Sequence, residues 1–135
     1  MKRANELSKE SINSGGGPFG SVIVKNDKII SEGINRVTVN NDPTAHGEIV
    51  AIRNACKELN TFNLSGCELF SSCEPCPMCL SAIYWSHIDL VYYANNREDA
   101  KKTGNYDLAD KIRKELNEEG IDIKDIKDKT TWNYK

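Results

Sequence analysis

One histidine, one glutamate and two cysteines have the types and spacing needed for metal-dependent hydrolysis. His46 and Glu48 are separated by one residue, and Pro75-Cys76-x-x-Cys79 follows about thirty residues later. One imidazole and two thiolates are ligands that zinc prefers, and three protein ligands leave the fourth position open for water or hydroxide. We therefore expect one catalytic Zn²⁺ per chain, held by His46, Cys76 and Cys79, with Glu48 as the proton carrier.

The expected chemistry is the attack of an activated water molecule on a ring carbon that bears an amino group. Bound zinc lowers the pKa of its water from about 15.7 to near 7, which supplies hydroxide at neutral pH. Glu48 would take that proton and deliver it to the ring nitrogen and then to the departing amine, because ammonia leaves only when protonated. The order His-x-Glu, then Pro-Cys-x-x-Cys, is typical of zinc-dependent nucleobase deaminases.

Cys73 leaves a second interpretation open, that of a structural zinc site. With Cys73 as a fourth ligand the coordination sphere would be closed, and the protein would be a non-catalytic, zinc-stabilised binding module. We favour the catalytic site because Cys73 precedes the second helix and ends a strand. Glu48 also has no use in a purely structural site. Cys56 and Cys67 are expected to be core thiols.

Each pair of chemically active residues falls at the start of an expected helix. Apolar residues recur at helical spacing over 46–59, and a second helix is expected over 76–86, with proline tolerated in its first turn. One turn separates Cys76 from Cys79, so both lie on one face of that helix. The positive N-terminus of a helix stabilises thiolates, which favours ligation.

The rest of the chain supplies elements that position these helices. An antiparallel hairpin is expected over 19–24 and 28–33, around Asn26-Asp27, followed by a loop over 35–45 in which Asp42 or Thr44 caps the next helix. The other expected elements are helices at 4–14 and 107–119 and strands at 67–71, 88–94 and 121–123. Strands that alternate with helices predict an α/β fold, with a mixed five-stranded sheet between two helical layers.

Length and composition favour one globular domain over residues 1–135. Charged residues make up 28% and hydrophobic residues 39%, which is an ordinary balance. The net charge of -2 and the lack of a basic cluster argue against nucleic acid as a partner. We see neither a signal peptide nor an apolar run of about 18 residues, so no membrane partner is expected. Three of the five cysteines, Cys73, Cys76 and Cys79, are closely spaced. In a chain without a secretory signal, this indicates metal binding in a cytoplasmic protein.

These motifs resemble the cytidine deaminase-like superfamily and, more narrowly, its bacterial zinc-dependent guanine deaminases. The resembling segments are Gly17-Pro18-Phe19-Gly20, Asp42-Pro43-Thr44-Ala45-His46-Gly47-Glu48, Ser72-Cys73-Glu74-Pro75-Cys76-Pro77-Met78-Cys79 and Ala82-Ile83-Tyr84-Trp85. The zinc motif is shared by the whole superfamily, so it indicates the reaction and not the base. The narrower resemblance implies a purine-metabolism enzyme that hydrolyses free guanine to xanthine and ammonia, and that forms a homodimer.

The resemblance also implies roles for individual residues. Asn35 matches a residue that hydrogen-bonds the purine, and Asp107 matches an acidic residue at the guanine edge, where a carboxylate can accept two N–H bonds. Asp107 is equally well placed to cap the helix that follows it. Pro75 would line the pocket beside the leaving amine. Phe19 and Trp85 are candidate pocket walls, although core packing is the favoured role for each.

Three departures from the guanine deaminase pattern leave other bases possible as substrates. Gly47 replaces the usual alanine, a variant that resembles the motif of fungal cytosine deaminases. Asn105-Tyr106 replaces the usual Phe-Asp. The C-terminal tail, about 124–135, is short for a segment that in these enzymes covers the active site and is exchanged between subunits. Trp132 or Tyr134 would then supply the lid aromatic. Cytosine deamination is therefore the first alternative substrate assignment.

A second alternative is adenosine editing of transfer RNA. Asn35-Arg36 and Lys102-Thr103-Gly104 also resemble the enzymes that carry out this reaction. The acidic balance of the chain and the lack of a basic C-terminal helix count against a polyanionic substrate.

Overall fold

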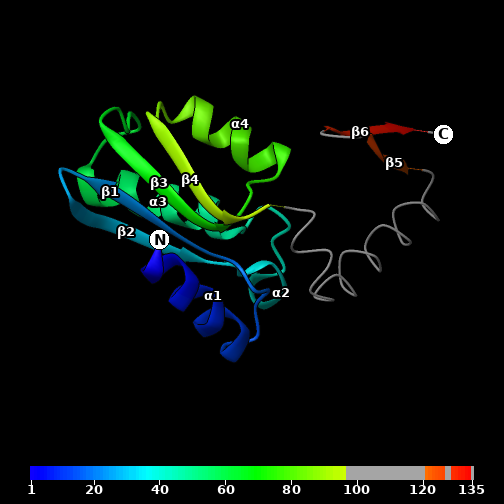
Figure 1. Ribbon diagram of the computed structural model, residues 1–135, viewed down its shortest axis with the longest axis horizontal. Helices are drawn as coiled ribbons and strands as arrows, with labels where there is room; N and C mark the ends of the chain where they lie inside the picture. The colour runs from blue at the N-terminus through cyan, green and yellow to red at the C-terminus, as the bar shows by residue number, and fades with distance from the viewer. Residues whose placement is uncertain (97–120, 127–128, 135) are drawn as a thin grey trace. The chain divides into compact units, whose positions relative to one another are not determined.

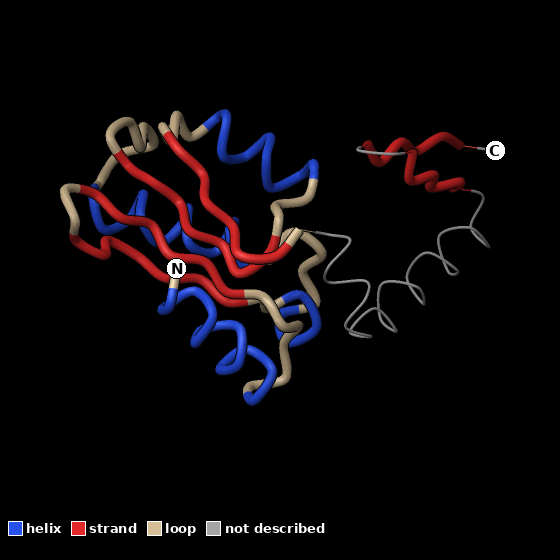
Figure 2. The backbone as a smooth tube through the Cα atoms, viewed as in Figure 1, coloured by secondary structure: helices blue, strands red, loops and turns tan. Residues whose placement is uncertain are grey.

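The computed structural model describes residues 1–96, 121–126 and 129–134, and its contacts divide the chain into two units, Met1–Arg97 and Glu98–Lys135. In the first unit, a sheet lies between two layers of helices (Figures 1 and 2). In the second unit, β5 (Ile121–Ile126) pairs with β6 (Lys129–Tyr134) as an antiparallel ribbon. A single domain over 1–135 stays a prediction.

The sheet of the first unit is mixed, with the strand order β2-β1-β3-β4. Its strands are β1 (Gly20–Lys25), β2 (Lys28–Ile34), β3 (Cys67–Cys73) and β4 (Leu90–Asn95). β1 is antiparallel to both of its neighbours, whereas β3 and β4 are parallel and need a crossover helix between them. Asn26 and Asp27 both have positive φ, as a two-residue hairpin turn between β1 and β2 requires.

Alternation along the central strands gives each helical layer its own core. Val22 of β1 packs with Ala4 and Leu7 of α1 (Lys2–Asn13) on one face. Its neighbour Ile23 points to the other face, where it packs with Ala51 and Ala55 of α3 (Gly47–Leu59) and with Ile83 of α4 (Pro77–Trp85). A side-chain period of two along a strand therefore separates two apolar clusters across one sheet.

A glycine sets the distance between β2 and the start of α3. A Cβ atom on Gly33 would overlap the carbonyl oxygen of Gly47 and the amide nitrogen of Ala51. The helix backbone therefore lies directly on the strand, which fixes the position of the first turn of α3. A Cβ atom on Gly47 itself would meet its nearest neighbours at 3.4 Å, an ordinary van der Waals separation.

The structure confirms the hairpin, the mixed sheet and the helices that start near 46 and 76. Two expectations about the connecting segments are wrong. Neither Asp42 nor Thr44 caps α3, whose N-cap is His46, because the Asp42 carboxylate accepts hydrogen bonds from the backbone N–H and hydroxyl of Thr44 within the loop. The loop over 35–45 contains a short helix, α2 (Val37–Asn40). In the tail, 129–134 forms the strand β6, which the sequence did not predict.

The expected five-stranded sheet is also corrected. The described residues form a four-stranded sheet, and the strand expected at 121–123 is β5, whose hydrogen-bonded partner is β6. Antiparallel strands can be joined by a short connection, so β5 pairs with the strand that follows it in the sequence. The helix expected over 107–119 lies outside the described residues. In the described part, no helix is both long and apolar enough to cross a membrane.

Candidate active site

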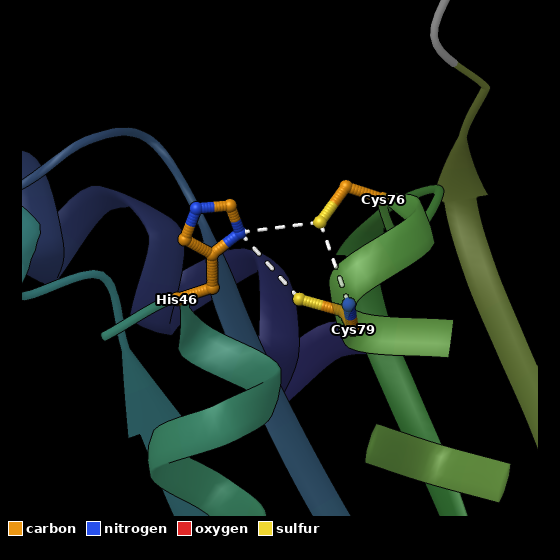
Figure 3. Close-up of side chains that lie close together, drawn as sticks. All are labelled: His46, Cys76 and Cys79. Atoms are coloured by element: carbon orange, nitrogen blue, oxygen red, sulfur yellow. Dashed lines mark hydrogen bonds between the residues drawn. The ribbon is translucent and has the colours of Figure 1, made fainter. Parts of the chain in front are cut away.

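Three ligand-type side chains meet where α3 and α4 begin. His46 is the N-cap of α3 and Cys76 is the N-cap of α4, with Cys79 one turn further along. Nδ1 of His46 lies 3.5 Å from the sulfur of Cys76 and 3.5 Å from that of Cys79 (Figure 3). Within the described residues, these three form the group whose ligand atoms all lie within 4.8 Å of one another.

The geometry of this group fits a tetrahedral zinc ion. With Zn–N near 2.0 Å and Zn–S near 2.3 Å, tetrahedral angles place the nitrogen about 3.5 Å from each sulfur. The observed separations of 3.5 Å match that value. The donor set of one imidazole and two thiols is also one that selects zinc over magnesium or calcium. His46, Cys76 and Cys79 could therefore hold zinc without rearrangement of the two helices.

The two thiols of the site differ in pKa because they share a proton. The pKa of Cys76 is lowered to about 4, chiefly by a hydrogen bond from the Cys79 thiol, with help from His46 and the backbone N–H of Cys79. The same bond raises the pKa of Cys79, because its proton is held between the two sulfurs. The pKa of His46 is raised chiefly by its hydrogen bond to Cys76. Metal binding must displace these protons, so protons compete with the metal for the three ligands.

Glu48 lies in the first turn of α3, two residues after His46. Its side chain is buried, with 6% of its surface exposed, and this desolvation raises the pKa of its carboxyl. A carboxyl with a raised pKa can exchange a proton near neutral pH more readily than an exposed one. Glu48 therefore has the burial expected of a proton carrier. It lies beside the ligand-type residues because Glu48 and His46 both lie at the start of α3.

Asn35 is buried next to the glycine turn that precedes β1. Its Oδ1 accepts hydrogen bonds from the backbone N–H groups of Val37 (3.2 Å) and Gly17 (3.5 Å). Two N–H donors on one side fix the orientation of the amide, which leaves the Nδ2 group to donate. Asn35 follows β2, and a backbone hydrogen bond from Arg36 to Ala45 joins this segment to the residue before His46.

Phe19 directly precedes β1 and is partly buried. Its carbonyl accepts a hydrogen bond from the backbone N–H of Asn35 and lies against Gly47. Pro75 is fully buried and directly precedes the Cys76 cap. The structure thus brings Phe19, Asn35 and Pro75 to segments that adjoin the three ligand-type residues.

Trp85 is a predicted site residue that the structure does not bring to this cluster. Trp85 ends α4, at the opposite end of the helix from Cys76, and is 76% exposed. Core packing is therefore wrong for Trp85, and its role as a pocket wall stays a prediction. Asp107 lies outside the described residues.

The other three cysteines lie in the apolar core or at its edge. Cys73 is buried at the end of β3 and is not a member of the three-residue ligand group within the described residues. Cys67 is fully buried and Cys56 packs against the same apolar cluster, and burial raises the pKa of both. The structure thus gives no support to a four-ligand site closed by Cys73.

Two serines that the sequence did not single out reach the site from the sheet. The hydroxyl of Ser71 donates to Oε1 of Glu48 at 3.4 Å, and the hydroxyl of Ser21 donates to Ser71 at 3.3 Å. Both serines occupy strand positions that alternation assigns to the buried face. A polar residue at a core position was the available signal.

The fold and this cluster together define a class of protein. The chain belongs to the cytidine and deoxycytidylate deaminase family, since residues 1–95 match the model of the family's zinc-binding region. Guanine deaminase of Bacillus subtilis (strain 168) is 56% identical over 105 residues, which cover 77% of this chain and 67% of that protein. The tRNA-specific adenosine deaminase of Aquifex aeolicus (strain VF5) is 44% identical over 94 residues, with coverages of 70% and 62%.

Solved structures give the same grouping. The X-ray structure of Bacillus subtilis guanine deaminase superposes with a TM-score of 0.74 at 57% identity, covering 76% of this chain and 66% of that one. Guanine deaminase from Nitrosomonas europaea gives a TM-score of 0.72 at 34% identity, covering 77% and 61%. The matched part of the chain therefore spans between 61% and 67% of the length of these three relatives.

Proposed function

We propose that the protein is a zinc-dependent hydrolase that deaminates free guanine to xanthine and ammonia. The observation that supports it most is the meeting of His46, Cys76 and Cys79 at two helix starts, with the buried Glu48 in the first turn of α3. The guanine deaminase relatives at 56% and 34% identity favour guanine over the bases of other family members.

In this proposal zinc, when bound by the three ligands, would supply an activated water molecule as the nucleophile. Glu48 would receive the proton of that water, because its carboxylate is buried beside the ligands. It would deliver that proton to the ring nitrogen of guanine, then take the second proton from the hydroxyl group now attached to the ring carbon and pass it to the departing amino group. One water is consumed and one ammonia is released, so the carbon that bore the amino group becomes a carbonyl.

Asn35 would hold the purine through its side-chain amide. Because Oδ1 is occupied by two backbone N–H groups, the amide would act as a donor and would bind an acceptor atom of the base. Asp107 would accept hydrogen bonds from the N–H groups of the guanine edge, as expected from the resemblance. Phe19, Pro75 and Trp85 are proposed as pocket walls.

An ammonia-release assay over guanine, cytosine, adenine, their nucleosides and transfer RNA tests the substrate. We expect guanine to have the highest kcat/KM. A higher kcat/KM for cytosine would overturn the guanine assignment and leave the deaminase chemistry intact. Release of ammonia from transfer RNA alone would favour adenosine editing, the activity named for the Aquifex aeolicus relative. No release from any substrate, with zinc bound, would support a binding module instead.

We also propose a cytoplasmic homodimer. Five free cysteines, three of them near the site, suit a reducing compartment. Tyr84 and Trp85 are each 76% exposed on α4, and large exposed aromatic side chains are typical of protein interfaces. Light scattering should give twice the chain mass of 15.1 kDa, and a monomeric mass would contradict the dimer.

A further inference from the structure

The buried face of β3 changes character as it approaches the site. Alternate residues from Cys67 onward face α3 and α4. Cys67 and Leu69 belong to the apolar core on that face, whereas the next residue in the alternation is Ser71. On β1 the same step leads from Ile23 to Ser21. Ser71 and Ser21 are 2% and 1% exposed, so two hydroxyls occupy positions where apolar side chains would continue the core.

Strand register places the two serines together and next to the start of α3. Ser21 and Ser71 are directly paired in the antiparallel β1–β3 ladder, so their side chains emerge on the same face. Ser21 donates to Ser71 at 3.3 Å, and Ser71 donates to Oε1 of Glu48 at 3.4 Å. The hydroxyls of Ser21 and Ser71 therefore form one chain of hydrogen bonds that ends on the Glu48 carboxylate.

We propose that Ser71, supported by Ser21, is a positioning residue that holds the Glu48 carboxylate for proton transfer. The inference rests on the proposed function, in which Glu48 carries the protons. A hydrogen bond to one carboxylate oxygen restricts rotation of the side chain, so the other oxygen faces the reacting water and the base. Loss of the bond changes how often the carboxylate is aligned, and it leaves the metal ligands and Asn35 in place.

The test compares Ser71→Thr with Ser71→Val in the zinc-loaded, full-length protein. These side chains have nearly the same shape, so any overpacking is common to both and only the hydroxyl differs. With guanine as substrate, we expect Ser71→Thr to retain most of kcat and Ser71→Val to lose about tenfold or more, with KM little changed. Equal kcat values for the two variants would overturn the proposal.

Two further variants keep the test decisive if position 71 does not tolerate a larger side chain. Ser21→Ala removes the support for Ser71 without touching Glu48, and we expect a smaller fall in kcat than for Ser71→Val. Ser86→Ala is the control, because Ser86 is also buried but donates to the carbonyl of Ile83 within α4. Wild-type kcat in Ser21→Ala together with unaltered Glu48 spectra would overturn the role of Ser21 and Ser71 as a pair.

A spectroscopic measurement separates failure of this inference from failure of the proposed function. The carbon-13 shift of the Glu48 carboxyl, assigned by its disappearance in Glu48→Gln, should move in Ser71→Val and Ser21→Ala but not in Ser86→Ala. Zinc content, measured in parallel, should stay at one ion per chain. If the wild type releases no ammonia, the proposed function fails, while the carbon-13 shift still reports whether Ser71 binds the carboxylate. An unmoved shift in Ser71→Val would overturn the inference even in an active enzyme.

Discussion

The two helical layers on the sheet use charged side chains in opposite ways. On the α1 face, Arg3 lies 2.6 Å from Glu32 of β2 and 2.7 Å from Glu10, with the Arg3 and Glu32 side chains about one third exposed. On the α3/α4 face, Glu48 is 6% exposed and neighbours His46 and two cysteines. The rim charges are paired and solvated, so they hold a helix to a strand. The ion pair with Arg3 lowers the pKa of Glu32, whereas burial raises the pKa of Glu48, and a buried carboxyl with a raised pKa beside ligand-type residues is a candidate for a functional site.

The largest effect is expected when a ligand is removed from the α3/α4 face. Cys76→Ser should lose zinc, and guanine deamination should fall toward the uncatalysed rate, a loss of about 10⁶-fold or more. Metal analysis and ammonia release measure the two effects. Cys56→Ser, which alters a thiol outside the ligand group, should keep both zinc and activity. Retained zinc and turnover in Cys76→Ser would mean that this sulfur is not a ligand.

Zinc affinity should also depend on pH, with a sign set by the protons of the metal-free site. The pKa of His46 is raised above its ordinary 6.5, so the ring stays protonated to a higher pH and zinc must displace that proton. Affinity should therefore weaken as the pH falls from 8 to 6. Competition titrations with a chelator of known affinity measure it, and a pH-independent affinity would contradict the site.

The next largest effect is expected from Glu48→Gln, which keeps the size of the side chain and removes its basicity. We expect zinc content to stay at one ion per chain and kcat to fall by about 10²–10⁴-fold. Thermal melting of the zinc-loaded variant should not drop, because the unfavourable burial of a carboxylate is relieved. Unchanged kcat would exclude Glu48 as the proton carrier.

A smaller effect separates the two glycines that meet between β2 and α3. Gly33→Ala should lower the free energy of unfolding by about 1–3 kcal/mol, because the new Cβ overlaps the backbone of α3. Gly47→Ala is the matched control and should be neutral or stabilising by up to about 1 kcal/mol, since space exists there and alanine favours helix. Urea denaturation measures both. Equal losses would show that β2 does not set the position of α3.

The smallest effect belongs to the α1 face. The hydrogen bond from Arg3 lowers the pKa of Glu32, so the pair stabilises the fold above the ordinary value of 4.5, and the stabilisation is lost as the pH falls through the lowered pKa. Glu32→Gln should cost about 0.2–1 kcal/mol at pH 7, because the pair is partly exposed and screened by salt. Urea midpoints of variant and wild type should converge below pH 4.5. Glu58→Gln, an exposed control on α3, should show no such convergence.

The features that the sequence predicted well depend on short-range patterns. His46 and Glu48 are two residues apart, and Cys76 and Cys79 are one helical turn apart, so each pair is set by local helix geometry. That the two pairs would meet followed from matching ligand chemistry, and the structure brings the three ligand-type atoms together. The β1–β2 hairpin was equally local, with Asn26-Asp27 as its turn.

The features that the sequence did not predict depend on competition or on long-range register. Asp42 bonds to Thr44 within its own loop, which a capping rule could not distinguish from a bond to α3. The contact between Ser21 and Ser71 joins residues 50 positions apart, and it follows from the β1–β3 register, which no local pattern encodes. The partner of β5 likewise depended on a strand, β6, in a tail whose polarity suggested none.

The start of α3 at His46 has a consequence for how the chain remains folded. His46 caps α3 without a side-chain hydrogen bond, and Cys76 is about thirty residues further along. An ion held between them would act as a reversible cross-link, and cross-links that close long loops reduce the entropy of the open chain the most. A chain that mispairs α3 with α4 could not retain the ion. The same coordination that activates water would thus also restrict catalysis to correctly folded molecules.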